Sequence, residues 1–185
     1  VNMASGGLIH VKGGTLRLEY GALSNWTANR SDLTIDSGAS FDLWDNNNAG
    51  VFVDALNGAG AITRSNHGQT GTITIGVDNG SFTFEGVLAN STSTGNLRKE
   101  GTGTITLAGN NTFTGSVGIN LGVLRITRSA GLGTGTKSIS INASADKLLE
   151  LDGSGGNITL PSSITYQTSG VNGTIRNVAG NNTIA

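Results

Sequence analysis

The sequence has no cysteine, one proline, two tryptophans and few charged residues among its 185 positions. Without cysteine, no disulfide can stabilise the fold. A single proline and the absence of glycine at every third position exclude a collagen-like chain. Eleven Lys and Arg stand against twelve Asp and Glu, so the chain lacks the basic surface that nucleic-acid binding needs. No apolar run approaches the roughly 18 residues of a membrane-spanning helix, so we expect no membrane insertion.

Four residue types dominate instead: 30 Gly, 23 Thr, 20 Asn and 18 Ser make up about half of the chain. All four are weak helix formers, so helices are not expected. Short runs that alternate apolar and polar residues predict strands and argue against disorder. The alternating runs are 15–19, 40–44, 71–75, 81–84, 104–107, 123–126, 138–141 and 149–151.

These runs recur along the chain, which indicates a repeat architecture. Similar segments recur at long offsets from Ile62 to Leu97, from Ile75 to Leu107 and from Phe84 to Phe113. Shorter offsets join Leu107 to Ile126 and Leu18 to Ile35. The shorter spacing, near twenty, predicts one coil of a β-solenoid, with Gly and Asn at the corners. The predicted fold class is all-β, a right-handed parallel β-helix, in one domain over residues 1–185.

Residues 97–125 read LRKEGTGTITLAGNNTFTGSVGINLGVLR. This stretch resembles the autotransporter-associated β-strand repeat, and the resemblance extends over about residues 84–142. It implies a right-handed parallel β-helix in an exported bacterial protein, located outside the cell or at its surface. It implies no activity. We expect the chain to be a segment excised from a longer exported protein.

The acidic residues offer little for catalysis. Asp32, Asp36, Asp42 and Asp45 form the densest group, and they are predicted to lie on a solvated strand face. No residue is therefore assigned a catalytic role, and we expect no enzyme. Oxygen ligands between Asp42 and Asn48 leave calcium possible, but no other cofactor or metal is predicted.

Carbohydrate binding is the function that the remaining residues favour, because sugars stack on aromatic rings and bond to carboxylates and amides. Trp44 is predicted to face outward beside Asp42, and Trp26 lies in a polar loop earlier in the chain, at an offset close to one predicted coil. Stacking of such coils would bring Trp26 next to Trp44. The predicted binding residues are Trp26, Trp44, Asp42, Asp45 and Tyr20, although both tryptophans could instead fill a covered corner.

Two functional readings follow. In the first, the chain is a non-catalytic carbohydrate-binding module for a plant cell-wall polysaccharide such as xylan, attached to a catalytic domain such as a glycoside hydrolase. In the second, it is a structural stalk or adhesin segment of an autotransporter-like surface protein and needs no binding site.

Overall fold

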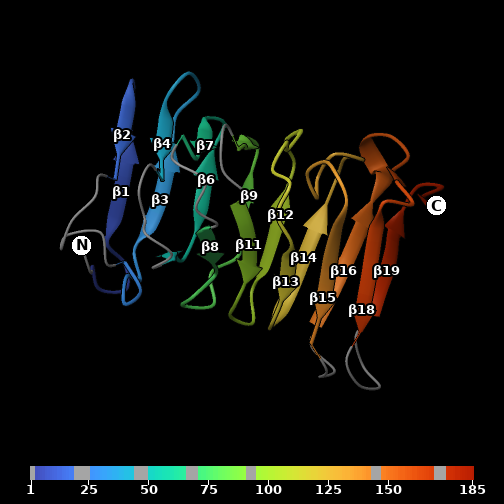
Figure 1. Cartoon of the computed structure of the whole chain (residues 1–185). Coiled ribbons are helices and arrows are strands. Elements are labelled where there is room, and N and C mark those ends of the chain that lie inside the picture. Colours follow the sequence, from blue (N-terminus) through green and yellow to red (C-terminus); the bar gives the residue numbers. More distant parts are fainter. Residues whose placement is uncertain are drawn as a thin grey trace.

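The computed structural model describes residues 3–18, 26–43, 50–65, 71–90, 95–142, 147–168 and 174–185. This part of the chain winds into stacked coils in which every paired strand is parallel to its neighbour in the next coil (Figure 1). The coils follow one another from the N-terminal to the C-terminal end, so the two termini lie at opposite ends of the molecule. The predicted all-β fold, a parallel β-helix, is confirmed.

The strands stack into three main sheets, named A, B and C, and one short one. Between β3 (Asp32–Ile35) and β11 (Gly95–Lys99), each coil visits sheets A, B and C in that order. Sheet A contains β1 (Leu8–Val11), β3 (Asp32–Ile35), β6 (Leu56–Gly58), β9 (Phe82–Phe84), β12 (Thr104–Leu107), β14 (Gly122–Ile126), β16 (Lys147–Asp152) and β19 (Thr174–Ala179). Sheet B contains β2 (Thr15–Arg17), β4 (Ser40–Asp42), β7 (Ala61–Thr63) and β10 (Val87–Leu88). Sheet C contains β5 (Val51–Val53), β8 (Gly71–Ile75), β11 (Gly95–Lys99), β13 (Val117–Ile119), β15 (Lys137–Ile141) and β18 (Ile164–Thr168).

The short sheet pairs β17 (Thr159–Leu160) with β20 (Thr183–Ile184). The one helix among the described residues is the 3-10 turn η1 (Gly153–Gly155), so no helix in this part is long and apolar enough to cross a membrane.

The strand register gives the true length of a coil, which varies along the molecule. Leu107 pairs with Ile126, as the shorter offset predicted. Gly58, by contrast, pairs with Phe84, so the coil that joins them is longer. The predicted equivalence of Leu18 and Ile35 is wrong, because Ile35 pairs with Val11.

The longer offsets do not measure a coil either. They compare segments that belong to different parts of the coil. Ile62 lies in sheet B and Leu97 in sheet C, while Ile75 lies in sheet C and Leu107 in sheet A. Strands on different faces share the same alternating pattern, so their similarity does not reveal which of them are stacked.

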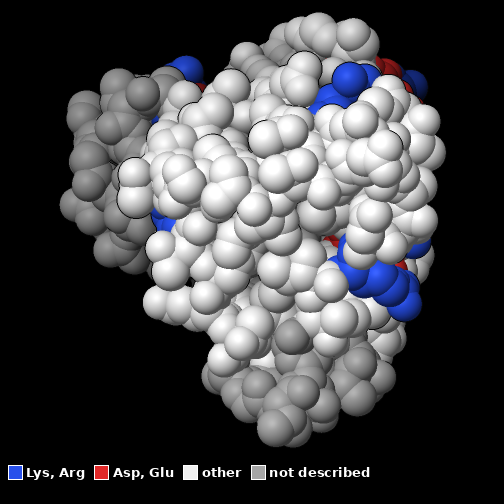
Figure 2. Space-filling view, turned by 90° about the vertical axis from the view of Figure 1, so that its right-hand side faces the viewer, with Lys and Arg blue, Asp and Glu red and all other residues white. Residues whose placement is uncertain are grey.

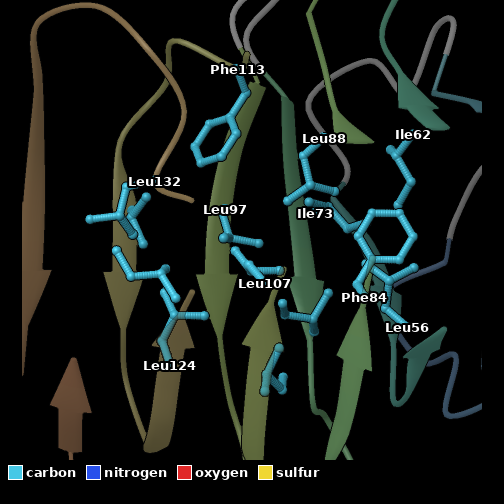
Figure 3. Close-up of a cluster of buried hydrophobic side chains, with 14 of the residues drawn as sticks. Leu56, Ile62, Ile73, Phe84, Leu88, Leu97, Leu107, Phe113, Leu124 and Leu132 are labelled. Atoms are coloured by element: carbon cyan, nitrogen blue, oxygen red, sulfur yellow. The ribbon is translucent and has the colours of Figure 1, made fainter. Parts of the chain in front are cut away.

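The core runs through the middle of the stacked coils, where most strands of the inner coils contribute alternate apolar side chains (Figure 3). In sheet A, Ile105 and Leu107 of β12 stack on Leu124 and Ile126 of β14, and all four are fully buried. A single coil could not shield these side chains from water, so stacking is what stabilises them.

Asn79 shows why asparagine is frequent at the corners. Its φ of 70° is the one positive value among the described non-glycine residues. Asparagine tolerates this conformation better than other side chains do. Its side-chain oxygen also accepts a hydrogen bond from the backbone N–H of Thr102 in the next coil, at 2.9 Å. This corner turns the chain, as the composition predicted, and it also joins two coils.

Candidate functional site

Trp26 does not form the exposed platform that the sequence suggested. Its side chain is only 3% exposed, and its ring centroid lies 5.6 Å from that of Phe41. Its backbone forms a parallel bridge with Val51, which lies further along the chain than Trp44 does. The coil is longer here than the sequence suggested, so Trp26 pairs with Val51, while the predicted neighbour Trp44 lies outside the described residues. Burying a large aromatic ring in the core is the favourable outcome.

Asp42 also differs from expectation. It points away from buried Phe41 as predicted, but it is only 2% exposed. Neighbouring coils cover it: Arg17 Nε donates to its carboxylate at 3.1 Å, and Ser65 donates through its backbone N–H at 3.2 Å and through its hydroxyl. These hydrogen bonds make Asp42 a link between three successive coils. The other predicted binding residues, Trp44, Asp45 and Tyr20, lie outside the described residues.

The remaining acids of the predicted group have local partners. Asp36 bonds to the ring of His10 at 2.8 Å, and Asp32 accepts the backbone N–H of Ala55 at 3.0 Å. Within the described ranges, no three His, Asp or Glu side chains are grouped so that they could hold a metal ion. The stretch from Asp42 to Asn48, which suggested calcium, runs mostly outside those ranges.

Two buried lysines are the polar feature that sequence reasoning missed. The ammonium group of Lys99, at the end of β11, donates to the carbonyl oxygens of Glu100, Gly101 and Leu121 at 2.6, 2.7 and 3.1 Å. Burial lowers the pKa of Lys99 to about 8, although nearby Glu100 opposes the shift. The carbonyl groups belong to two successive coils, so this cation fastens one corner to the next.

Lys137 has the same role at another corner. Its ammonium group donates to the carbonyl oxygens of Phe113 and Leu132 at 2.7 and 2.8 Å, and it lies 4.1 Å from the centre of the Phe113 ring. Burial lowers the pKa of Lys137 to about 8. From the sequence, a lysine in a strand is expected to face solvent. Its partners here are backbone carbonyl groups at the corners, which only the folded chain brings close to it.

Glu150 is the buried acid of sheet A. It is completely buried in β16, between two arginines on neighbouring strands. Arg125 Nη2 lies 2.7 Å from one of its oxygens, and Arg176 pairs with the other. The acid is fully paired and the two arginines come from adjacent coils, so this cluster joins three coils and leaves no free carboxylate.

A polar hollow of about 440 Å³ lies on the outer face of sheet C. It crosses strands β8, β11, β13 and β15, and it is lined by Thr72, Asn96, Leu97, Arg98, Ser116, Val117, Gly118, Asn120, Ser140 and Asn142. The register places Arg98, Gly118 and Ser140 side by side in one row. Asn142 donates to Asn120 at 2.6 Å, and Asn120 donates to Glu100 at 2.6 Å, so a ladder of amides borders the hollow.

A parallel β-solenoid in which most buried charges connect coils belongs to the structural class of repeat scaffolds. The comparisons agree with this class. Residues 97–126, from β11 to β14, match the family model of the passenger-associated-transport-repeat. The resemblance noted in the sequence is thus supported over this stretch.

One curated relative is the adhesin BmaC autotransporter of Brucella suis biovar 1 (strain 1330). It is 38% identical over 115 aligned residues, which cover 57% of this chain and 3% of the relative. This chain therefore spans only a small fraction of that protein's length. No solved structure matches the chain significantly.

Proposed function

We propose that this chain is a stretch of the exported passenger of a bacterial surface protein, in which it acts as a rigid, non-enzymatic scaffold. The passenger-type repeat at residues 97–126 and the similarity to an autotransporter adhesin support an exported, cell-surface location. The adhesive activity named for the relative belongs to a protein many times longer than the aligned segment, so we assign this chain the scaffold role.

The main support for the proposal is the structural role of the residues in the matched repeat. Residues 97–126 run from β11 to β14, which is one full coil followed by the first two strands of the next. Within this stretch, Ile105, Leu107 and Ile119 are fully buried, and Lys99 fastens the corner. The repeat therefore specifies stacking, and we infer that it contributes architecture to the passenger.

Both ends of the described solenoid support a longer stack. Leu16 and Ile184 are 39% and 43% exposed, yet they lie in register with Phe41 and Leu160, which are fully buried. The difference arises because no coil among the described residues covers the outer side of Leu16 or Ile184. Figure 2 shows the end that carries β18 and β19, and most of its surface is uncharged. An end with few charged residues suits the addition of further coils.

Surface proteolysis tests the location. The full-length parent protein would be produced in its own bacterium, and intact cells would be treated with a protease that cannot enter them. We expect an antibody against residues 1–185 to detect loss of this segment on intact cells. A cytoplasmic protein in the same sample should survive, which controls for lysis. If the segment is degraded only after lysis, the proposal is wrong.

We propose polysaccharide binding as a second role, with a different site from the one that the sequence suggested. The burial of Trp26 and the pairing of Asp42 remove two of the five predicted residues from the accessible surface. Neither comparison names a glycan, and neither supports xylan or a plant polysaccharide. The polar hollow on sheet C favours a sugar ligand, because hydroxyl and amide groups line it.

A further inference from the structure

Arg98 is a charged group with no partner among the residues that the structure describes. It lies in the middle of sheet C, exposed, between Thr74 of β8 and Gly118 of β13. Arg17, Arg125 and Arg176 all pair with carboxylates. By contrast, Arg98 makes no hydrogen bond or ion pair with any residue in the described ranges. A free guanidinium in a polar hollow is suited to binding a carboxylate, whose two oxygens match its fork of N–H groups.

Gly118 opens the hollow beside Arg98, and nothing in the fold requires a glycine there. A Cβ atom added to Gly118 would lie 3.6 Å from Ser140 Oγ and 3.8 Å from Asn120 Oδ1, which are ordinary contacts. Its φ is not in the positive range, unlike those of Gly58 and Gly122 in other strands. A glycine inside a strand is unfavourable, since it adds flexibility and contributes no packing. Leaving this position without a side chain keeps the hollow open.

The groups around Arg98 are held in place before any ligand arrives. The side-chain oxygen of Asn96 accepts the backbone N–H of Ser116 at 3.0 Å, which orients one edge of the hollow. The amide ladder through Asn120 and Asn142 orients the opposite edge. A preformed set of amides and hydroxyls lowers the entropic cost of binding a polar ligand.

We propose that this hollow on sheet C binds a polysaccharide that carries uronic-acid carboxylates, with Arg98 bound to a carboxylate and the amide and hydroxyl rows bound to sugar hydroxyls. The inference rests on the proposed display of the chain at the cell surface, where such a glycan would be met.

A protein partner fits this face less well. Its anchors are commonly large apolar side chains in apolar pockets, or a strand added to a free sheet edge. The exposed large apolar residues among the described ones are Leu8, Leu16, Val178 and Ile184, and none belongs to sheet C. The strands under the hollow are paired, so they offer no free edge. Nucleic acid would need several cations, whereas only Arg98 lines the hollow.

Affinity electrophoresis in gels that contain polygalacturonate tests the proposal with the 185-residue chain. We expect polygalacturonate to retard the chain and neutral arabinoxylan to leave its mobility unchanged. Arg98→Ala should weaken the affinity about tenfold, the typical effect of losing a charge-assisted hydrogen bond. Arg98→Lys should give an intermediate loss, because lysine keeps the charge without the planar fork.

Two further variants separate the hollow from net charge. Lys12→Ala removes the same charge from an exposed corner outside the hollow, and it should change the affinity by less than about twofold. Gly118→Val fills the hollow without changing the charge and should weaken binding as Arg98→Ala does. Circular dichroism would verify that each variant keeps its β-structure.

Three results would overturn the inference: no retardation by polygalacturonate, equal losses for Arg98→Ala and Lys12→Ala, or retardation by arabinoxylan that Arg98→Ala leaves intact. A sulfated glycan that retards the chain where polygalacturonate does not would refute the carboxylate assignment. None of these results bears on the surface scaffold, which the proteolysis experiment tests separately.

Discussion

At the scale of single residues, buried charges in this solenoid act as connections between coils. Lys99, Asp42 and Glu150 each bond to groups from at least one neighbouring coil. Each is paired, as buried charged groups must be if their burial is not to be prohibitively unfavourable. Their substitution should therefore alter stability, and pH should act through the buried lysine.

The pKa of Lys99 predicts a specific pH dependence. Its pKa is about 8 in the folded protein against an ordinary value of 10.5, so the unfolded chain binds more protons between these pH values. Stability should therefore rise with pH across this window as the unfavourable burial of the charge is relieved. Between pH 8 and 10, the urea midpoint of the natural chain should rise relative to that of Lys99→Met. A difference between the two midpoints that stays flat across this pH range would contradict the assignment.

Asp42 should be important for folding. Replacing it with alanine leaves the half-buried backbone N–H and hydroxyl of Ser65 without their acceptor. We expect Asp42→Ala to lower the free energy of unfolding by about 1–3 kcal/mol, measured by urea denaturation. The matched control is Asp36→Ala, because the Asp36 side chain is 44% exposed and its pairing with His10 should contribute less than about 1 kcal/mol. Equal losses for the two variants would refute the structural role of Asp42.

At the scale of elements, two glycines of the same coil should respond in opposite ways to substitution. In the chain segment that follows β12, a Cβ on Gly109 would overlap the carbonyl oxygen of Gly86 in the preceding coil. In β13, a Cβ on Gly118 has room. The close approach of backbones explains the first glycine, and we attribute the second to the ligand hollow.

Thermal unfolding of alanine variants tests this contrast. Gly118→Ala should raise the free energy of unfolding by up to about 1 kcal/mol, because alanine is the less flexible residue and fits the strand. Gly109→Ala should lower it by at least about 2 kcal/mol, because two coils must move apart. A destabilised Gly118→Ala would show that the strand itself needs the glycine.

At the scale of the whole molecule, the register permits a coil to be added. Ile105 and Leu124 occupy equivalent positions on β12 and β14, so the segment 105–123 forms one complete coil. Duplicating 105–123 should give a folded chain that is longer by about 5 Å along its axis, the spacing of paired strands. It should also be more stable, because each added coil contributes a stacking interface.

Small-angle X-ray scattering would measure the added length, and thermal unfolding would measure the stability. Duplicating only the segment 105–114 is the control, since a partial coil shifts the apolar residues that follow it out of register with the core. If the partial duplication folded as stably as the complete one, stacking register would not be the source of stability.

The alternating runs and the Gly and Asn content were enough to predict stacked parallel strands, and the sequence of residues 97–125 was enough to predict the repeat family. These are local properties: alternation reports that one face of a strand is buried, and a corner residue reports a turn. The predicted coil length agreed with the structure between Leu107 and Ile126 and between Leu97 and Val117, whereas the coil from Gly58 to Phe84 is longer.

Tertiary structure alone decided which residues meet across coils. Trp26 faces Val51 because the corner loops differ in length, and no alternation pattern records that difference. The partners of Lys99 are backbone carbonyls of two coils, which carry no sequence signal of their own. The hollow beside Arg98 likewise depends on four strands from separate coils lying in register. The sequence by itself determined the strands and corners of this protein, because these depend on neighbours in the chain. The stacking register determined its surfaces and its buried charges, because these depend on residues about one coil apart.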